Sequence, residues 1–497
     1  MVYSEDYKKL VDATALKDKY YEIDERVEEI CKEAFKGCDK LEEIVMPKKL
    51  KKIDSEAFQG CSSLTKLTLP DSVARIDGLA FCGCSGLTEL TLPNSVKSIG
   101  DGAFADCSGL EKITVESGNS RYDSRDNCNS IIDKKTNTLI AGCKNSVIPN
   151  SVARIDGLAF CGCSGLTELT LPNSVKSIGR YAFQGCTGLT ELTLPNCVRV
   201  VEACAFAYCS GLTELTLPNS VKSIGRCAFQ GCTGLTELTL PNCVRVVEAC
   251  AFAYCSGLTE LTLPNSVTRI GNHAFDSCSG ITKLTLPNSV KSIGRYAFQG
   301  CTGLTELTLP KSVKSIGDGA FAYCSGLTEL TLPNSVKSIG DGAFAYCSGL
   351  TELTLPNSVK SIGRYAFQGC SGLTELTLPN SVKSIGDRAF AYCSGLTELT
   401  LPNSVTSIGN CAFGGCSGLT ELTLPNSITS IGDYAFAYCS DLSKITSLAE
   451  IPPMCGFKVF NGVNKTNCEL IVPEGSVAAY TRAEDWNKFS NIRGFSK

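Results

Sequence analysis

One unit of 23 residues recurs along most of this chain, and no other feature limits its possible folds as strongly. A clean copy, LTELTLPNSVKSIGDGAFAYCSG, runs from Leu327 to Gly349, and the next copy begins at Leu350. Seventeen units can be aligned on a shared cysteine. A single unit cannot bury its own apolar face, so neighbouring units must stack, and their interfaces supply the stability. The repeat therefore predicts a solenoid.

The apolar residues of each unit follow the order Leu-x-x-Leu-x-Leu, Val-x-x-Ile and Ala-Phe-x-x-Cys. In one unit, Leu192 and Leu194 alternate with Glu191 and Thr193, which is the spacing of a strand with one buried face. Pro-Asn ends this strand, because Pro cannot donate to a neighbouring strand and Asn favours a turn. Val-x-x-Ile predicts a second short extended segment, and Ala-Phe-x-x-Cys predicts about one helical turn.

The period is broken between Cys107 and Cys163, where a longer segment replaces one coil. We expect this irregular coil at residues 116–148, with a hairpin from Ser130 to Gly142.

Both ends of the chain are expected to be caps, because a solenoid must cover its terminal apolar faces. Residues 1–19 predict a helical N-terminal cap, residues 20–446 a solenoid of about 17–18 coils, and residues 447–497 a C-terminal cap. The C-terminal cap is expected to contain a strand and a helix, with Trp486 and Phe489 packed over the last coil.

The pattern Leu-x-x-Leu-x-Leu-Pro-x-x-Val-x-x-Ile-Gly-x-x-Ala-Phe-x-x-Cys closely resembles the BspA-like class of leucine-rich repeats, over about residues 20–446. The insert YDSRDNCNSIIDKKTNTLIAGCKNSVIP and the tail from IPPMCGF to NIRGF also look like bacterial members of that class. The resemblance implies a leucine-rich-repeat solenoid, a β-rich α/β right-handed superhelix. It also implies a bacterial surface protein, and some members bind host matrix or plasma proteins such as fibronectin and fibrinogen.

Charge and hydropathy exclude several classes of partner. The formal net charge of -4 is small for this length, and the chain has no basic run and no Gly-rich phosphate loop, so we expect no nucleic-acid partner and no cofactor. No apolar stretch is long enough to span a bilayer, so no membrane insertion is expected. The first residues do not read as a secretory signal, which leaves open a cytosolic protein or one whose signal has been removed. The family resemblance implies a secreted or cell-surface location. We expect a monomer.

The 30 cysteines suggest a disulfide scaffold by number but not by spacing. One cysteine recurs in each unit just after Ala-Phe-x-x, which predicts a buried column of free thiols. A second column, Cys204, Cys227 and Cys250, falls at a position that elsewhere holds Tyr or His. Stacked coils would bring its members about 5 Å apart, so it is a weak candidate for a disulfide or a metal site. The alternative is that Cys simply replaces Tyr there.

The open face of the Leu-x-x-Leu-x-Leu strands, called the strand face from here on, is the candidate binding surface. One acidic residue per unit lies in a single register, interrupted by Lys66, Lys112, Lys283 and Lys444, and a column of Thr runs parallel to it. The candidate residues are Glu191, Thr193, Glu214, Thr216, Glu237, Glu260, Glu306, Glu329, Glu352, Glu375, Glu398 and Glu421. Since the open face of a strand must be polar in any case, these residues can also be read as solvated positions kept by duplication.

No residue pattern indicates catalysis. The only histidine, His273, occupies the place that Tyr181 and Tyr296 hold in other units, and no partner or orienting group for it can be identified. We therefore expect a non-enzymatic binding protein, an adhesin-like solenoid that recognises host or neighbouring-cell proteins or glycans through its strand face.

The alternative is an intracellular protein–protein interaction scaffold or spacer, suggested by the missing signal and the unpaired thiols. A third hypothesis, an ice- or mineral-templating surface, fits the regular Thr spacing but not the intervening Glu.

Overall fold

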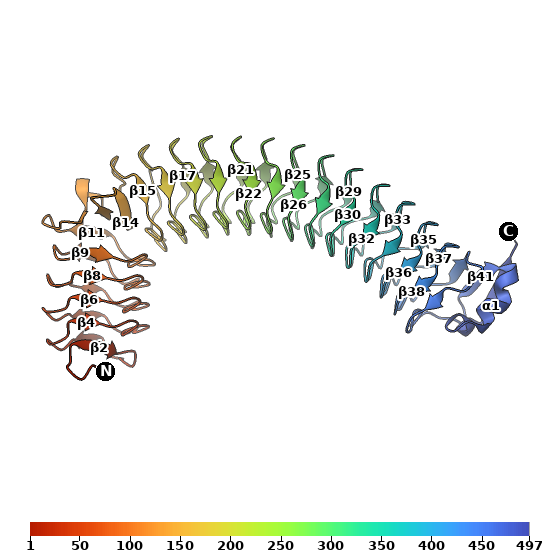
Figure 1. Ribbon diagram of the computed structural model, residues 1–497, viewed down its shortest axis with the longest axis horizontal. Coiled ribbons are helices and arrows are strands. Elements are labelled where there is room, and N and C mark those ends of the chain that lie inside the picture. Colours follow the sequence, from red (N-terminus) through yellow and green to blue (C-terminus); the bar gives the residue numbers. More distant parts are fainter. Residues whose placement is uncertain (497) are drawn as a thin grey trace. The chain divides into compact units, whose positions relative to one another are not determined.

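The chain folds as a stack of short parallel strands linked by turns (Figure 1). The computed structural model describes residues 1–496. They form two compact units, Met1–Val244 and Arg245–Lys497. With about 21 turns and a repeat of about 23 residues, the structure confirms the predicted solenoid.

Each regular coil carries two strands, as the sequence predicts. In the coil that begins at Leu327, β29 (Glu329–Thr331) comes from Leu-x-x-Leu-x-Leu and β30 (Ser338–Ile339) from Val-x-x-Ile. Leu330 and Ile339 are buried, whereas Glu329 is exposed. Strands of the first kind form the first column of each unit, and strands of the second kind form the second column.

The first column positions the strand face. In Met1–Val244 it consists of β3 (Tyr20–Glu22), β5 (Glu43–Val45), β7 (Lys66–Leu67), β9 (Glu89–Leu92), β11 (Lys112–Val115), β17 (Glu191–Thr193), β19 (Glu214–Thr216) and β21 (Glu237–Thr239). In Arg245–Lys497 it consists of β23 (Glu260–Thr262), β25 (Lys283–Thr285), β27 (Glu306–Thr308), β29, β31 (Glu352–Thr354), β33 (Glu375–Thr377), β35 (Glu398–Thr400), β37 (Glu421–Leu424), β39 (Lys444–Ser447), β41 (Glu469–Pro473) and β42 (Asn491–Phe495).

The second column is made almost entirely of two-residue strands. In Met1–Val244 these are β4 (Glu29–Ile30), β6 (Lys52–Ile53), β8 (Arg75–Ile76), β10 (Ser98–Ile99), β15 (Arg154–Ile155), β16 (Ser177–Ile178), β18 (Val200–Val201) and β20 (Ser223–Ile224). In Arg245–Lys497 they are β22 (Val246–Val247), β24 (Arg269–Ile270), β26 (Ser292–Ile293), β28 (Ser315–Ile316), β30, β32 (Ser361–Ile362), β34 (Ser384–Ile385), β36 (Ser407–Ile408), β38 (Ser430–Ile431) and β40 (Met454–Cys455).

The Ala-Phe-x-x-Cys segment is not the helical turn that the sequence predicts. The N–H of Cys347 donates to the carbonyl of Phe344, three residues back, but Gly342 (φ 62°) and Tyr346 (φ 60°) both have left-handed backbone. Since a right-handed helix needs negative φ at every residue, it cannot propagate through these positions. The segment is instead a succession of tight turns.

The core of each unit is built from repeated Phe and Cys side chains. Phe321 and Phe344 stack with ring centroids 5.4 Å apart, and the same stacking recurs from coil to coil. The Cys347 thiol donates to the carbonyl oxygen of Phe321 in the preceding coil at 3.2 Å. Equivalent bonds of 3.1–3.3 Å recur along both units. The cysteine that recurs in each coil thus supplies both a small apolar side chain and a donor for a buried carbonyl.

Residues 1–19 do not form the helix that the sequence predicts. They contain β1 (Val2–Tyr3) and β2 (Lys9–Asp12), which pair antiparallel, and β2 continues parallel onto β4. Leu10, Ala13 and Leu16 are buried, and their spacing of three imitates a helix although they face the core from a strand and the turn that follows. This segment is the first turn of the solenoid.

The irregular coil contains the predicted hairpin. It is formed by β13 (Ser130–Asp133) and β14 (Thr138–Gly142), with β12 (Tyr122–Asp123) paired to β13, and a short helix, η1 (Arg125–Asn127), lies between β12 and β13. β14 then joins β15, so the extra strands enter the second-column sheet. At the turn edge no coil is added, because the N–H of Asp106 donates directly to the carbonyl of Cys161 at 2.7 Å. The insert therefore widens the stack on one side only.

The C-terminal segment closes the end of the unit Arg245–Lys497. Between β41 and β42 lie η2 (Glu474–Ser476), α1 (Val477–Arg482) and η3 (Trp486–Lys488). Trp486 and Phe489 are buried, with ring centroids 5.2 and 5.3 Å from that of Phe460, so they pack over the last coil as expected. Within residues 1–496, no helix has the length and apolar composition needed to cross a membrane.

Candidate binding surface

The candidate strand-face residues all project outward. Every one of the twelve side chains named from the sequence is exposed. The parallel ladders hold them in register: Glu191 lies opposite Glu214, and Thr193 opposite Thr216. Within each compact unit the ladders therefore produce two parallel columns, one acidic and one of Thr hydroxyls, with successive members of a column about 4.8 Å apart.

The acidic column in Arg245–Lys497 is neutralised at two interruptions. Lys283 pairs with Glu306 at 3.1 Å, and Lys444 pairs with Glu421 at 3.1 Å. The four acidic side chains between these two pairs make no ion pair with any residue that the structure describes. They are Glu329, Glu352, Glu375 and Glu398. A run of uncompensated carboxylates on a polar, open face can bind cationic groups of a partner.

The first coils carry a different charge pattern on the same face. Lys66 pairs with Glu43 at 2.6 Å, and Lys112 lies 4.0 Å from Glu89. Charges of opposite sign thus alternate here, whereas like charges follow one another in the later coils.

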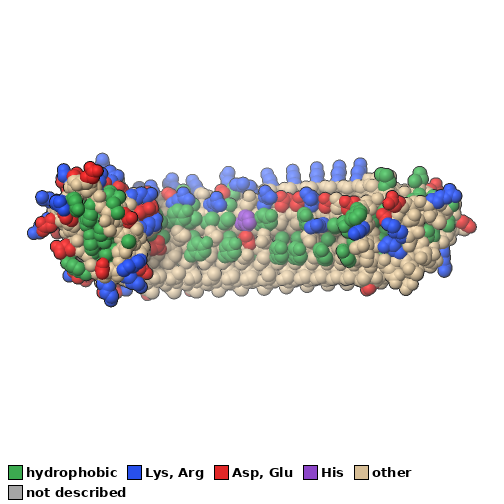
Figure 2. Space-filling model, turned by 90° about the horizontal axis from the view of Figure 1, so that it is seen from below, with side chains coloured by type: hydrophobic (Ala, Val, Ile, Leu, Met, Phe, Trp, Pro, Cys, Tyr) green, Lys and Arg blue, Asp and Glu red, His purple; other side chains and the backbone are tan. Residues whose placement is uncertain are grey.

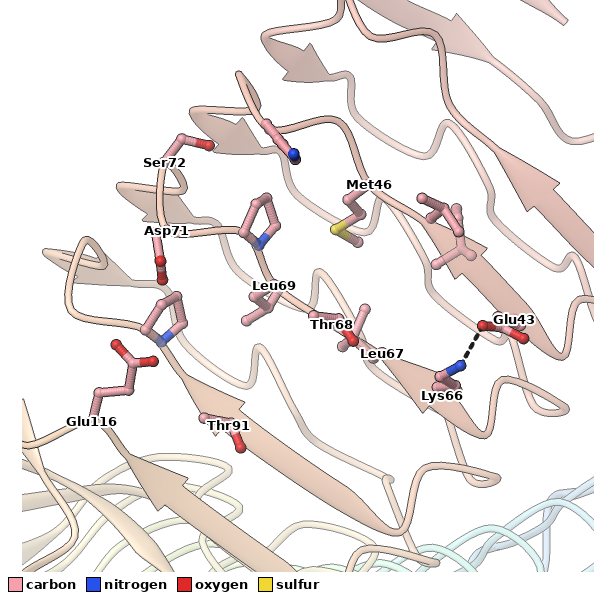
Figure 3. A pocket seen from close by; sticks show the side chains of 15 residues that line it. Glu43, Met46, Lys66, Leu67, Thr68, Leu69, Asp71, Ser72, Thr91 and Glu116 are labelled. Carbon is pink, nitrogen blue, oxygen red and sulfur yellow. Dashed lines mark hydrogen bonds and ion pairs between the residues drawn. The ribbon is translucent and has the colours of Figure 1, made fainter.

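A pocket of about 950 Å³ lies on this N-terminal part of the strand face, across β5, β7 and β9 (Figure 3). Val45, Leu67 and Leu69 supply apolar surface to it, and Val45 is 37% exposed. The Glu43–Lys66 ion pair lies at one end, and Glu116 lies at the other. An apolar centre with charged ends suits an extended peptide better than a small metabolite, because the site is an open surface and not an enclosed cavity.

The repeat pattern of the sequence does not predict this pocket. Its signal was a departure from the repeat: Val45 and Met46 stand where regular coils have Thr and Leu, and Lys48 stands where they have Asn. Such departures are not visible in the positions that all coils share.

A second pocket, of about 670 Å³, lies on the strand face of the same unit after the irregular coil. It is lined by three of the sequence-predicted residues, Glu191, Thr193 and Thr216. The coil of Glu168 has no first-column strand, so the ladder is interrupted there and the surface is hollowed.

The thiol column is neither a disulfide nor a metal site in this structure. No disulfide joins Cys204, Cys227 and Cys250, and all three are half-buried with left-handed backbone at φ of 56–57°. Burial raises the pKa of the Cys204 thiol, and the neighbouring Cys227 raises it further, so thiolate chemistry is disfavoured there. Within residues 1–496, no group of three or more His, Cys, Asp or Glu is placed to hold a metal ion.

His273 has a partner that the sequence did not reveal. Its Nδ1 lies 2.8 Å from Oδ2 of the buried Asp276, and Ser277 donates to the other carboxylate oxygen at 2.9 Å. The hydroxyl thus bonds the carboxylate and not the imidazole, so the three groups do not form a nucleophile–base pair. The arrangement holds the imidazole against Tyr296, with ring centroids 4.9 Å apart.

Comparison with known proteins identifies relatives of the repeat. Residues 15–132, 130–259, 246–374 and 337–465 match the family described as "BspA type Leucine rich repeat region (6 copies)". A leucine-rich repeat protein from Bacteroides ovatus, known from its crystal structure, is 32% identical, with 75% of this chain and 82% of that chain covered and a TM-score of 0.52.

Two further crystal structures match a smaller share of this chain and have lower TM-scores. A leucine-rich cell surface protein from Faecalibacterium prausnitzii is 28% identical, with 60% of this chain and 92% of that chain covered and a TM-score of 0.43. The leucine-rich repeat protein of T. pallidum is 36% identical, with 35% of this chain and 77% of that chain covered and a TM-score of 0.30. No curated protein sequence matches the chain.

Proposed function

The chain belongs to the family of BspA-type leucine-rich-repeat proteins, and from this premise we infer that it is a non-enzymatic binding protein that acts through its strand face. Its partners are proteins or glycans of a host or of neighbouring cells. The observation that carries the proposal is the run of exposed, uncompensated carboxylates from Glu329 to Glu398, flanked by ion pairs at both ends.

Repetition is itself suited to such a role. Neighbouring coils present the same Glu and Thr groups in the same register, as Glu352 and Glu375 do. Individually weak contacts then add up through effective concentration when the partner also has several cationic or hydroxyl-bonding groups. The pocket across β5, β7 and β9 adds apolar surface that departs from the repeat, which favours a defined segment of partner protein there.

An intracellular scaffold is the second candidate, and one observation favours it. The exposed Cys197 and Cys243 form no disulfide. Proteins that work in oxidising surroundings usually pair such thiols.

The first experiment measures binding to immobilised fibronectin and fibrinogen, the plasma and matrix proteins that the family resemblance suggests. The variant E329Q/E352Q/E375Q removes three charges from the strand face and keeps side-chain size. We expect its binding to weaken roughly tenfold or more and the salt dependence to become shallower. The variant K337Q/K360Q/K383Q changes three charges in the same three coils but in the second column, and should bind as the parent does.

Equal binding by the parent and the Glu variant would remove the acidic column from the proposal. Protease treatment of intact producing cells separates the two candidate functions. Digestion with cytosolic markers intact agrees with an exposed adhesin-like protein, whereas full protection would overturn that proposal in favour of the scaffold.

A further inference from the structure

A second charged column runs along the opposite strand of the same coils. In Val-x-x-Ile, the residue after Val is Lys in five consecutive coils of the unit Arg245–Lys497: Lys291, Lys314, Lys337, Lys360 and Lys383. All five side chains are exposed. Thr268 and Thr406 occupy the same place in the coils on either side, so the five lysines form one uninterrupted run.

Backbone hydrogen bonds place these lysines directly over one another. The N–H of Lys314 donates to the carbonyl of Lys291, and the pattern continues through Lys337, Lys360 and Lys383 at 3.2–3.5 Å. With about 4.8 Å per coil, four steps make a straight cationic row roughly 19 Å long. Figure 2 shows an evenly spaced row of Lys and Arg side chains along the upper edge of the view.

The five ammonium groups have no acidic partner within the described chain. The nearest acidic residues along the sequence, such as Asp318 and Asp341, are engaged elsewhere: each accepts a backbone N–H from the next coil, at 3.0 and 2.8 Å. Asp318 also pairs with Arg295 at 3.3 Å.

An earlier coil shows that the fold can neutralise this position. Lys51 occupies the same register, stacks on Glu28 through a backbone bond, and forms an ion pair with it at 2.6 Å. The later coils replace such alternation with five like charges, which repel one another and attract a polyanion whose charges have a similar spacing.

The surroundings of the column favour a sugar chain. Each Lys is followed by a Ser, and Ser315, Ser338 and Ser361 are exposed and lie opposite one another in the ladder. A row of ammonium groups therefore runs beside a parallel row of serine hydroxyls. No aromatic side chain occurs in the Val-Lys-Ser-Ile segments, whereas single-stranded nucleic acids are usually held by bases stacked on aromatic rings.

We propose that this column, the lysine row, binds a linear anionic polysaccharide carrying sulfate or carboxylate groups. The ammonium groups pair with the anions of successive sugars, and the serine hydroxyls bond their hydroxyl or sulfate oxygens. This ligand site lies on a different column from the strand face and does not depend on the function proposed for that face.

The test uses the full chain and a size series of heparin oligosaccharides, with neutral dextran as the uncharged probe. Affinity should rise with oligosaccharide length and level off once the oligosaccharide spans the row. The variant K337Q/K360Q/K383Q should lose roughly tenfold or more in affinity and show a shallower salt dependence. The matched variant K337R/K360R/K383R keeps the charges and should bind as the parent does.

Two controls separate this proposal from the other one and from a folding defect. E329Q/E352Q/E375Q, in the same three coils, should bind heparin at least as well as the parent. Thermal unfolding of each variant reports whether the coils are intact. Heparin binding that is unchanged in an intact K337Q/K360Q/K383Q variant would overturn the proposal. So would binding of oligothymidylate or anionic lipid vesicles as tight as that of heparin at equal charge, because the row would then select charge alone.

Discussion

At the scale of single residues, the most consequential group is the repeated thiol. It looks like a small apolar filler in the sequence, but its Sγ also donates to the Phe carbonyl of the preceding coil, for example from Cys324 to Phe298 at 3.2 Å. Burial raises the pKa of the Cys324 and Cys370 thiols to about 12, from an ordinary value of 9.0. Burial also raises the pKa of the Cys209 and Cys439 thiols in the same column.

This burial predicts loss of stability in alkali. Above pH 9 the thiols of the unfolded chain lose their protons, whereas the folded chain keeps them until about pH 12. The unfolded state then binds fewer protons than the folded state, so the free energy of unfolding falls as the pH rises above 9. The stabilisation that these buried thiols contribute is complete only below pH 9. Circular dichroism between pH 8 and 11 should show a steep alkaline transition.

A variant with Cys324, Cys347 and Cys370 changed to Val tests the cause. It lacks three titrating thiols and should lose less stability per unit of pH, although it begins less stable because three Phe carbonyls lose their donors. An unaltered pH slope would show that other groups drive the transition.

The glycines of the turn segment give a second prediction at this scale. Gly369 has φ of 71°, and a Cβ there would lie 2.5 Å from the Tyr346 ring. Gly369→Ala should therefore cost the left-handed strain of about 1–2 kcal/mol and a steric term in addition. Gly342→Ala has similar strain (φ 62°) but meets only the Ala345 Cβ at 3.9 Å.

Urea unfolding of both variants separates the two terms, since only Gly369→Ala contains the clash. The double variant Tyr346→Gly/Gly369→Ala should recover the difference. Equal destabilisation of the two single variants would mean that the Tyr ring moves aside without cost.

At the scale of elements, strands and hairpin could be predicted, and the turns and first coil could not. Leu192 and Leu194 alternate with polar residues and form the predicted strand, although the same pattern forms no strand in the coil of Glu168. Leu10, Ala13 and Leu16 have helical spacing, and only the partner strand β4 decides that they are not a helix. A local pattern predicts an element correctly when only one type of element fits it. It fails when the hydrogen bonds that decide the conformation come from neighbouring coils.

The same limit applies to the candidate surfaces. The acidic column was visible because one register repeats. The pocket at Val45 was hidden because it depends on departures from that register. The lysine row is hard to recognise in the sequence because its members are 23 residues apart and form no run along the chain. In a solenoid, charge patches have to be sought across coils.

The C-terminal cap gives a prediction for one element. Trp486 is fully buried, donates its Nε1–H to the carbonyl of Pro453 at 3.0 Å, and packs on Phe460. Trp486→Ala should cost roughly 3–5 kcal/mol locally, because it leaves a cavity over the last coil. Hydrogen exchange should accelerate first in β39 and β41.

Trp486→Phe is the matched variant, since it keeps an aromatic ring but lacks the indole donor. It should cost less than the Ala variant. Unchanged exchange in the Ala variant would mean that the last coil does not need this cover.

At the scale of the whole molecule, the net charge of -4 conceals segregated charge. Coils such as that of Glu329 and Lys337 are close to neutral one by one, yet the Glu of each coil lies on the first column and the Lys on the second. Stacking therefore places like charges next to one another on two separate faces. Each face gains affinity for counter-charged partners, at the expense of stability within the stack.

That trade-off predicts the effect of reversing one charge. In Glu352→Lys, the new ammonium lies between Glu329 and Glu375, as Lys283 and Lys444 already lie beside acidic neighbours at 3.1 Å. Thermal stability at low salt should rise, by less than about 1 kcal/mol because the groups are exposed, and the gain should vanish in high salt. Glu43→Lys, which breaks the 2.6 Å pair with Lys66, should do the opposite. If Glu352→Lys instead destabilised the protein at low salt, the acidic column would not be a site of internal repulsion, and its uniformity could then be attributed to duplication alone.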